Sequence, residues 1–210
     1  MRAHPSSVLG RLTLGVSAIC VLCGCRPQAP RTPEGPAGTT ALEFGTDSTP
    51  QPATADDIHI FDPYIGRFQS MRWHDPDLDK DLHYLVEYRW FDSTRSVVRF
   101  KVSTEYLDGS QGVSNAAGFY GYDPFNGRLY TFGVFSSGVT GFGAVGAFDR
   151  TTGSRVTWAR SKGPDGVTTW VRDAFRMMNP DTWTDETSIR REGSEAWQVV
   201  YRDTFTRMGP

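Results

Sequence analysis

The chain has 210 residues, a formal net charge of −2 and three cysteines. Because no basic excess is present, nucleic-acid binding is not expected. All three cysteines (Cys20, Cys23 and Cys25) lie within the first 25 residues, so the rest of the chain can form neither a disulfide nor a cysteine-based zinc site.

The N-terminal segment reads as a signal for export. Arg2 and Arg11 give it a positive charge, and an apolar run follows that is shorter than the roughly 20 residues a membrane span needs. Leu22-Cys23-Gly24-Cys25 then resembles a lipobox, in which the last cysteine receives diacylglycerol. The alternative is an ordinary secretory signal with coincidental cysteines.

The resemblance to a lipobox implies lipid attachment at Cys25, with the bilayer as a partner. Arg26 follows that cysteine, and in the sorting rule of Gram-negative lipoproteins the absence of Asp there implies the outer membrane. We therefore expect a signal peptide over 1–24 and an exported protein anchored on the periplasmic side of that membrane.

Residues 25–57 are rich in proline, with glycine, serine and threonine between the prolines. Such a segment buries too little apolar surface to offset its ordering entropy, so it is expected to be a disordered tether. From residue 58 to 210 the composition changes to short apolar and aromatic runs separated by turn residues, which predicts one folded domain.

Ten strands are predicted between the turns. The clearest alternation places Tyr84, Val86, Tyr88 and Trp90 on one face of a strand, opposite polar residues. Short connections between such strands favour antiparallel neighbours, and closing the sheet removes its exposed edges. The sequence therefore predicts an all-β, up-and-down barrel, with a two-sheet sandwich as the alternative. The predicted strands are 64–73, 82–91, 95–106, 116–122, 128–135, 139–148, 154–160, 167–175, 183–191 and 197–207.

A resemblance to lipocalin-like (calycin) barrels rests on three places. Gly66-Arg67-Phe68 stands where these barrels carry Gly-x-Trp, and residues 118–130 (GFYGYDPFNGRLY) are similar to the G-Y-D-P-x-x-G-x-Y segment of a bacterial family of such barrels. The ending, from Asp181 through Trp197 to Arg207, resembles the last two strands of that family. The resemblance implies the fold but no activity, and it implies that Gly66, Phe68 and Arg207 close one end, with Arg207 covering Phe68.

The most interesting candidate site is a pair of carboxylates. Asp173 and Asp203 each lie on the face of their strand that carries the apolar residues. If these faces point inward, both carboxylates face the lumen, about 10 Å apart. A buried carboxylate is costly unless it is paired, so the pair could anchor a ligand or act as an acid and base. An internal ion pair or two solvent-facing ends are the structural alternatives. Aromatic residues that would line the same interior, or simply fill it, are Tyr88, Trp90, Phe100, Trp158 and Tyr201.

Other motifs give weaker signals. Residues 141–146 match G-x-G-x-x-G, but no helix follows to hold a pyrophosphate, so the glycines are interpreted as bend or bulge positions. Asp75, Asp77, Asp79 and Asp81 alternate as calcium ligands do, but the glycine and glutamate of an EF-hand loop are missing, and a solvated hairpin is favoured. No cofactor or metal is expected.

The leading hypothesis is a membrane-anchored barrel that binds a small apolar or amphipathic ligand. A structural or interaction module of the cell envelope is the alternative, and an enzyme that uses the lumenal carboxylates is the third. The sequence specifies neither the ligand nor the oligomeric state.

Overall fold

The computed structural model describes residues 50–75, 78–110, 112–135, 140–162 and 167–209. The predicted signal, the predicted lipid-attachment residue Cys25 and most of the predicted tether lie outside these ranges. The described part of the chain contains no helix that is long and apolar enough to cross a bilayer.

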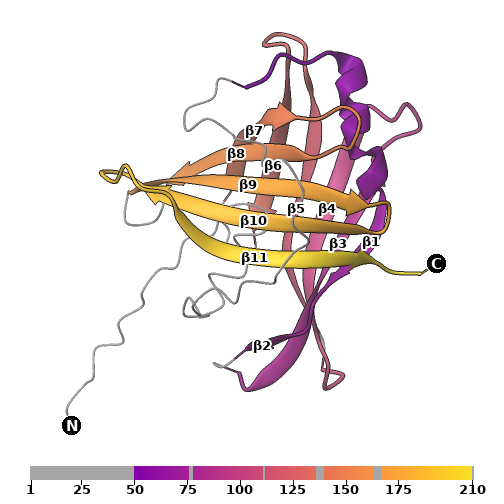
Figure 1. The fold of residues 1–210 in the computed structure, drawn as a ribbon, viewed down its shortest axis with the longest axis vertical. Coiled ribbons are helices and arrows are strands. Elements are labelled where there is room, and N and C mark those ends of the chain that lie inside the picture. Colours follow the sequence, from indigo (N-terminus) through magenta and orange to yellow (C-terminus); the bar gives the residue numbers. More distant parts are fainter. Residues whose placement is uncertain (1–49, 76–77, 111, 136–139, 163–166, 210) are drawn as a thin grey trace.

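The described residues form one antiparallel sheet that closes into a barrel (Figure 1). Ten strands make the ring, in which β1 pairs with β11 on one side and with β3 on the other. The short strand β2 is attached to β3 at the end remote from the helix (Figure 1). The predicted all-β barrel of about ten strands is thus confirmed. The strands are β1 (Gly66–Ser70), β2 (Trp73–Asp75), β3 (Lys80–Trp90), β4 (Val97–Tyr106), β5 (Val113–Asp123), β6 (Arg128–Phe135), β7 (Thr140–Phe148), β8 (Arg155–Lys162), β9 (Thr168–Asn179), β10 (Thr182–Arg191) and β11 (Gln198–Arg207).

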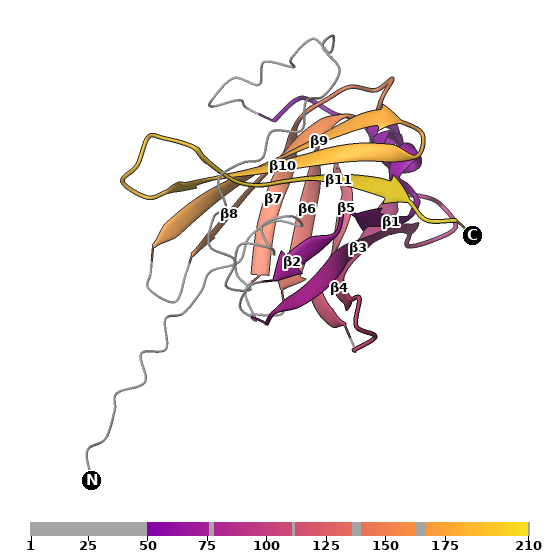
Figure 2. The same cartoon turned by 60° about the horizontal axis from the view of Figure 1, so that its bottom comes forward.

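Two sets of strands, β3–β7 and β8–β11, face each other and run crosswise (Figures 1 and 2). Within the first set, glycines lie side by side on three neighbouring strands, since Gly118 pairs with Gly133 and Gly133 with Gly141. The register of β7 and β8 also shifts between Val145 and Ala147, so the intervening Gly146 lies at a bulge. The glycine-rich segment 141–146 therefore serves the curvature of the sheet.

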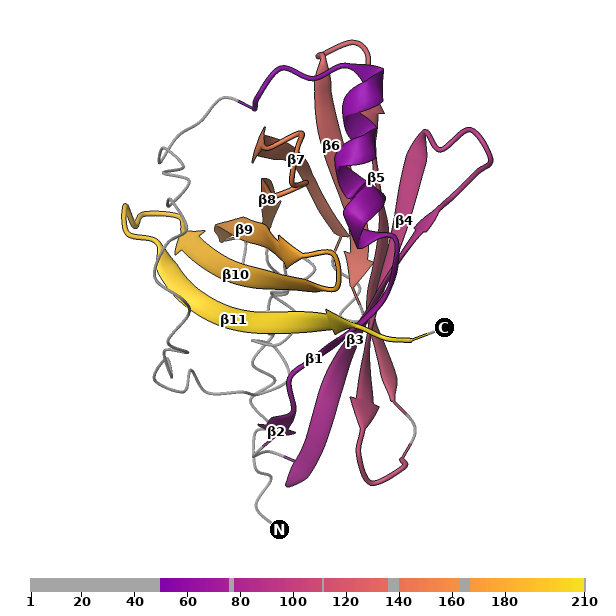
Figure 3. The same ribbon diagram turned by 45° about the vertical axis from the view of Figure 1, so that its right-hand side comes forward.

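One helix, η2 (Ala55–Tyr64), was not predicted. It is a 3₁₀ helix that contains Pro63 and buries Ile58, Ile60, Phe61 and Tyr64. It packs beside β5 and β4 at one end of the barrel (Figure 3). Its i→i+3 geometry does not produce the 3.6-residue period by which an α-helix is recognised in a sequence, so no local pattern indicated it.

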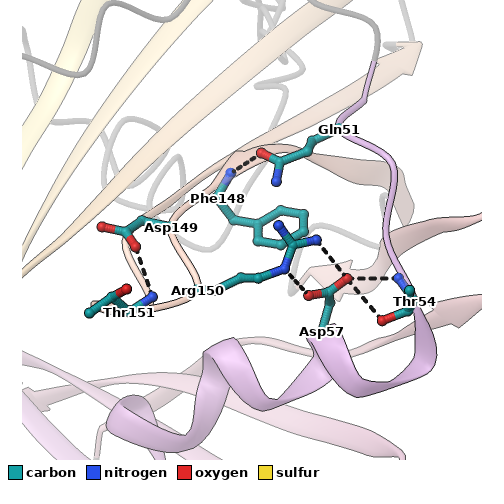
Figure 4. A network of polar contacts seen from close by, with 7 residues as sticks. All are labelled: Gln51, Thr54, Asp57, Phe148, Asp149, Arg150 and Thr151. Carbon is teal, nitrogen blue, oxygen red and sulfur yellow. Dashed lines mark hydrogen bonds and ion pairs between the residues drawn. The ribbon is translucent and has the colours of Figure 1, made fainter.

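The segment before the helix is held against the barrel (Figure 4). Arg150 donates from Nε and Nη2 to the two carboxylate oxygens of Asp57, at 2.5 and 3.0 Å, while the Thr54 backbone N–H donates to Asp57 Oδ2 at 2.7 Å. Gln51 Oε1 accepts from the backbone N–H of Phe148 at 3.1 Å. Residues 50–57 therefore belong to the folded domain, and the boundary expected at residue 58 moves toward the N-terminus.

The closure expected from the family resemblance is present. The guanidinium carbon of Arg207 lies 4.5 Å from the centre of the Phe68 ring, and Arg207 donates to the carbonyls of Ile65 and Pro63, each at 2.8 Å. Gly66 has a φ of +139°, and a β-carbon there would lie 2.5 Å from Arg207 Nη1. Only glycine leaves room for the arginine to tie the end of η2 to the barrel.

Aromatic rings fill the end of the barrel under η2. Trp183 stacks on Phe205 with ring centres 4.2 Å apart, and it also contacts Tyr64, Phe68 and Phe175. We call this part of the interior the aromatic half. Its residues are Phe61, Tyr64, Phe68, Tyr88, Phe100, Tyr120, Phe175, Trp183 and Phe205, all buried.

Candidate functional site

Three buried carboxyl groups lie on the inner face of adjacent strands. Asp173, Asp185 and Asp203 come from β9, β10 and β11, and none is more than 4% exposed. Asp185 is the direct cross-strand partner of Asp203, and it lies two residues along β10 from Thr187, which pairs with Asp173. Side chains of cross-strand partners point to the same face, so the three carboxyls form one cluster.

The carboxylate of Asp203 is well supplied with donors. Trp73 Nε1 donates to Oδ2 at 2.7 Å, the Tyr201 hydroxyl to the same oxygen at 3.0 Å, and the Thr204 backbone N–H to Oδ1 at 2.6 Å. Burial still raises the pKa of Asp203, although these donors act against the rise. Both oxygens of Asp203 therefore already accept hydrogen bonds from the chain itself, which gives this carboxyl a structural role.

Asp173 has one hydrogen bond to a side chain. The Thr187 hydroxyl donates to Asp173 Oδ1 at 2.7 Å. Burial raises the pKa of Asp173 to about 7, against the hydrogen bond from Thr187 and the positive charge of Arg155, which lower it. This carboxyl is consequently poised to change its charge near neutral pH.

Asp185 is the carboxyl that stands out. It is 2% exposed, and neither of its oxygens has a hydrogen-bond partner. Burial raises the pKa of Asp185 well above its ordinary value, and the nearby Asp173 and Asp203 raise it further, while Arg155 opposes the rise. A neutral carboxyl that lacks partners is costly in an interior, so it requires an explanation.

A fully buried guanidinium lies beside the carboxyls. Arg155 on β8 has its Cζ 4.1 Å from the ring centre of Phe175, 4.2 Å from Tyr64 and 4.5 Å from Phe61. Its Nη2 lies 3.4 Å from the Tyr88 hydroxyl, whereas Nε and Nη1 have no partner. The charge of Arg155 is thus held mainly by aromatic faces, and the arginine balances the charge of one carboxylate.

Beyond the carboxyls, the inner positions from β5 to β9 carry small side chains. Among them, Thr157 on β8 pairs with Asp173, is 3% exposed and has a hydroxyl with no hydrogen-bond partner. We call this surface the small-residue wall. Its residues, assigned by register and alternation, are Ala116, Thr131, Gly133, Thr157, Ala159, Thr169 and Val171.

The structure separates the aromatic residues that the sequence grouped. Tyr88 and Phe100 are packed in the aromatic half, and Trp90 lies at the barrel end beneath Arg95, 5.0 Å from its guanidinium carbon. Tyr201 lies on the inner face, and its ring is stacked 5.9 Å from that of Trp73.

Trp158 has to be removed from the set that lines the interior. It pairs with Arg172 on the face opposite Thr157 and contacts the ring of Trp197 at 5.4 Å, on the outside of the barrel. Its neighbour Thr157 occupies the inner position, because successive residues of a strand point to opposite faces.

Asp185 and Arg155 were not predicted from the sequence. A signal for Asp185 was available, because Trp183, Asp185 and Thr187 alternate along the predicted strand 183–191 as regularly as the residues around Asp173. No comparable signal existed for Arg155, since an arginine at the start of a strand usually faces water.

The acidic run before β3 does not gather into a metal site. Arg72 and His74 both contact the carboxylate of Asp81, and Asp75 Oδ1 accepts from the Leu78 backbone N–H at 3.3 Å, while Asp77 lies outside the described residues. No group of three or more acidic, histidine or cysteine side chains that could hold a metal is found in the described ranges.

Comparisons with known proteins add little to this geometry. No family model matches the chain, and no curated protein matches it. The S-type phycobiliprotein lyase CPES from Guillardia theta aligns at 12% identity and a TM-score of 0.44, over 72% of this chain and 92% of that one. A de novo designed fluorescence-activating β-barrel aligns at 13% identity and a TM-score of 0.30, over 70% of this chain and 95% of that one. Likenesses at these scores carry no functional inference.

Proposed function

We propose that this chain is an exported lipoprotein whose barrel holds a small amphipathic molecule on its small-residue wall. The observation that carries the proposal is the unpartnered Asp185 carboxyl inside the barrel. Such a group costs free energy in the free protein, and a bound molecule that donates a hydrogen bond to it removes that cost.

The dimensions of the barrel support the proposal. An eight-strand barrel is just wide enough for its own side chains to fill, and a ten-strand ring is wider. In the aromatic half, large rings occupy this extra width. Along the small-residue wall the inner side chains are alanine, glycine, threonine and valine, so the apolar part of a ligand would lie there.

Ligand binding is tested with an uncharged fluorescent probe, N-phenyl-1-naphthylamine, added to the purified full chain. We expect its emission to rise on binding and expect Ala159→Phe, on the inner face, to abolish the rise. Ala117→Phe, at an exposed position of β5, is the matched control and should leave it intact. Equal binding by both variants, or no binding to the unmodified chain, contradicts the proposal.

Anchoring is tested separately, by feeding cells an alkyne-labelled fatty acid. The proposal expects label and membrane association for the unmodified chain and their loss in Cys25→Ser. Cys23→Ser, two residues earlier, should keep both. A Cys25→Ser protein that remains labelled would refute attachment at this cysteine while leaving the ligand proposal untouched.

A further inference from the structure

We propose that the ligand's polar end is a primary amine, bound as an ammonium ion by the carboxyls of Asp185 and Asp173 and the hydroxyl of Thr157. This inference deepens the proposed function and rests on it. It names the chemical class that the inner wall is built to recognise.

The first argument is the balance of charge. Three carboxyl groups share the cluster, and Arg155 is the one basic residue among the buried side chains of the described chain. Asp203 is occupied by donors of its own chain, whereas Asp185 has none. One guanidinium can balance one ionised carboxylate, so a second carboxylate needs a cation from outside.

The second argument is the arrangement of unpartnered acceptors. An ammonium group is a donor of three hydrogen bonds with no acceptor. Asp185 offers two free oxygens and Thr157 a free hydroxyl, on either side of Asp173, whose Oδ1 already accepts from Thr187. The hydroxyl of Thr157 is evidence independent of the carboxyls, because a buried hydroxyl without a hydrogen-bond partner is also costly and also calls for a partner from outside the chain.

The groups that face Asp185 come from every element around it. Asp173 on β9 and Asp203 on β11 raise its pKa and Arg155 on β8 lowers it, with a small contribution from Glu186. Tyr64 of η2, Tyr88 of β3 and Tyr120 of β5 are also close enough to interact with its charge, and burial raises the pKa of each hydroxyl. In the free protein, burial and the neighbouring carboxyls raise the pKa of Asp185 well above its ordinary value, against the charge of Arg155, and so favour its protonated form.

Binding of an ammonium ion therefore displaces a proton. The carboxylic acid loses its proton to solvent, the carboxylate and the ammonium ion form a hydrogen-bonded pair, and the net charge inside the barrel does not change. Protons compete with the amine, so its affinity should rise as the pH increases from about 6 to about 8.

The test is competition against N-phenyl-1-naphthylamine by dodecylamine, dodecanol and dodecanoate, which share one tail. On the full chain we expect the amine to displace the probe at a concentration at least about tenfold lower than dodecanoate, with dodecanol between them. The amine's affinity should increase with pH over the range above, and that of dodecanol should not.

Asp185→Asn should remove most of the preference for the amine, and Thr157→Val should reduce it by a smaller factor. Glu186→Gln is the matched control, because it removes an acid at the next position of β10, where Glu186 pairs with Arg202 at 2.7 Å. If Asp185→Asn does not fold, the order of the three head groups and the Thr157→Val variant decide the question.

Equal displacement by amine and carboxylate, an unchanged preference in a folded Asp185→Asn variant, or an equal loss in Glu186→Gln overturns the amine assignment. In each of these cases the probe still binds and the proposed function stands. If the probe binds neither the chain nor any variant, the proposed function itself fails.

Discussion

The aromatic half and the small-residue wall share strands β5 and β9, but their inner side chains differ in size and in polarity. In the aromatic half, Trp183 and its neighbours fill the barrel and η2 covers them. On the small-residue wall, threonine, alanine and valine leave polar atoms of Thr157 and Asp185 without partners. The difference supports the proposal that the aromatic half stabilises the fold and the small-residue wall binds a ligand.

The largest effect should come from removing a ring of the aromatic half. Trp183→Ala is expected to lower the free energy of unfolding by roughly 3–5 kcal/mol, because it leaves a cavity among five aromatic neighbours. Trp170→Ala, on the outer face, should cost far less. Urea denaturation of both variants measures the difference, and equal losses would erase the distinction between the two parts.

The second prediction concerns larger side chains, which the aromatic half should tolerate less well than the small-residue wall. Val98→Phe introduces a ring at a fully buried position in the same cluster as the aromatic half and should cost about 1–3 kcal/mol of unfolding free energy. The same change at Val171, on the small-residue wall, should cost less than about 1 kcal/mol, because the surrounding side chains are small. If Val171→Phe is the more damaging of the two, the wall is already filled.

Loss of the contact that seats η2 should have a smaller effect. Asp57→Asn removes the charge that Arg150 and Thr54 bind, at an expected cost of about 1–2 kcal/mol. Asp56→Asn is the control, since Asp56 is exposed. The hydrogen bond from Arg150 lowers the pKa of Asp57, so its contribution is present above the unfolded-state pKa and is lost as pH falls through the folded-state pKa. A melting temperature equally insensitive to both changes contradicts this role.

The last prediction concerns the dependence of stability on pH. Burial raises the pKa of Asp173 and Asp185 in the folded state, so these two carboxyls hold more protons in the folded protein than in the unfolded chain above about pH 4. The contribution of these two carboxyls to stability is therefore greatest at mildly acidic pH and falls as the pH rises through about 7. We expect the melting temperature to be lower at about pH 8 than at about pH 5.

The double variant Asp173→Asn, Asp185→Asn should flatten that dependence. Glu186→Gln should not, because Glu186 lies on the outer face. A melting temperature that rises over the same interval in the unmodified chain is the contrary result.

Much of the fold could be predicted from the sequence, because period-two alternation and turn residues are local signals. The Arg207–Phe68 contact followed from a family resemblance. The helix η2 and the docking of Gln51 and Asp57 depend on contacts with β7 and its turn, far along the chain, and no local pattern reports them.

The candidate site was predicted only in outline. Alternation placed Asp173 and Asp203 on inner faces, but their roles differ because Asp203 is engaged by Trp73, 130 residues away in the sequence. Asp185 lies between them on a strand whose position in the ring only the assembled barrel defines. Partners and their absence are tertiary properties, and for that reason the sequence alone did not reveal the unpartnered carboxyl.

The most direct test of the account is the titration of the aspartate side chains followed by carboxyl carbon NMR on the folded chain. We predict that Asp173 titrates at about 7 and that the pKa of Asp185 lies well above that of an ordinary aspartate. If Asp185 instead titrates close to an ordinary aspartate, then water or the chain itself supplies its partners, and the argument for a ligand on this wall fails.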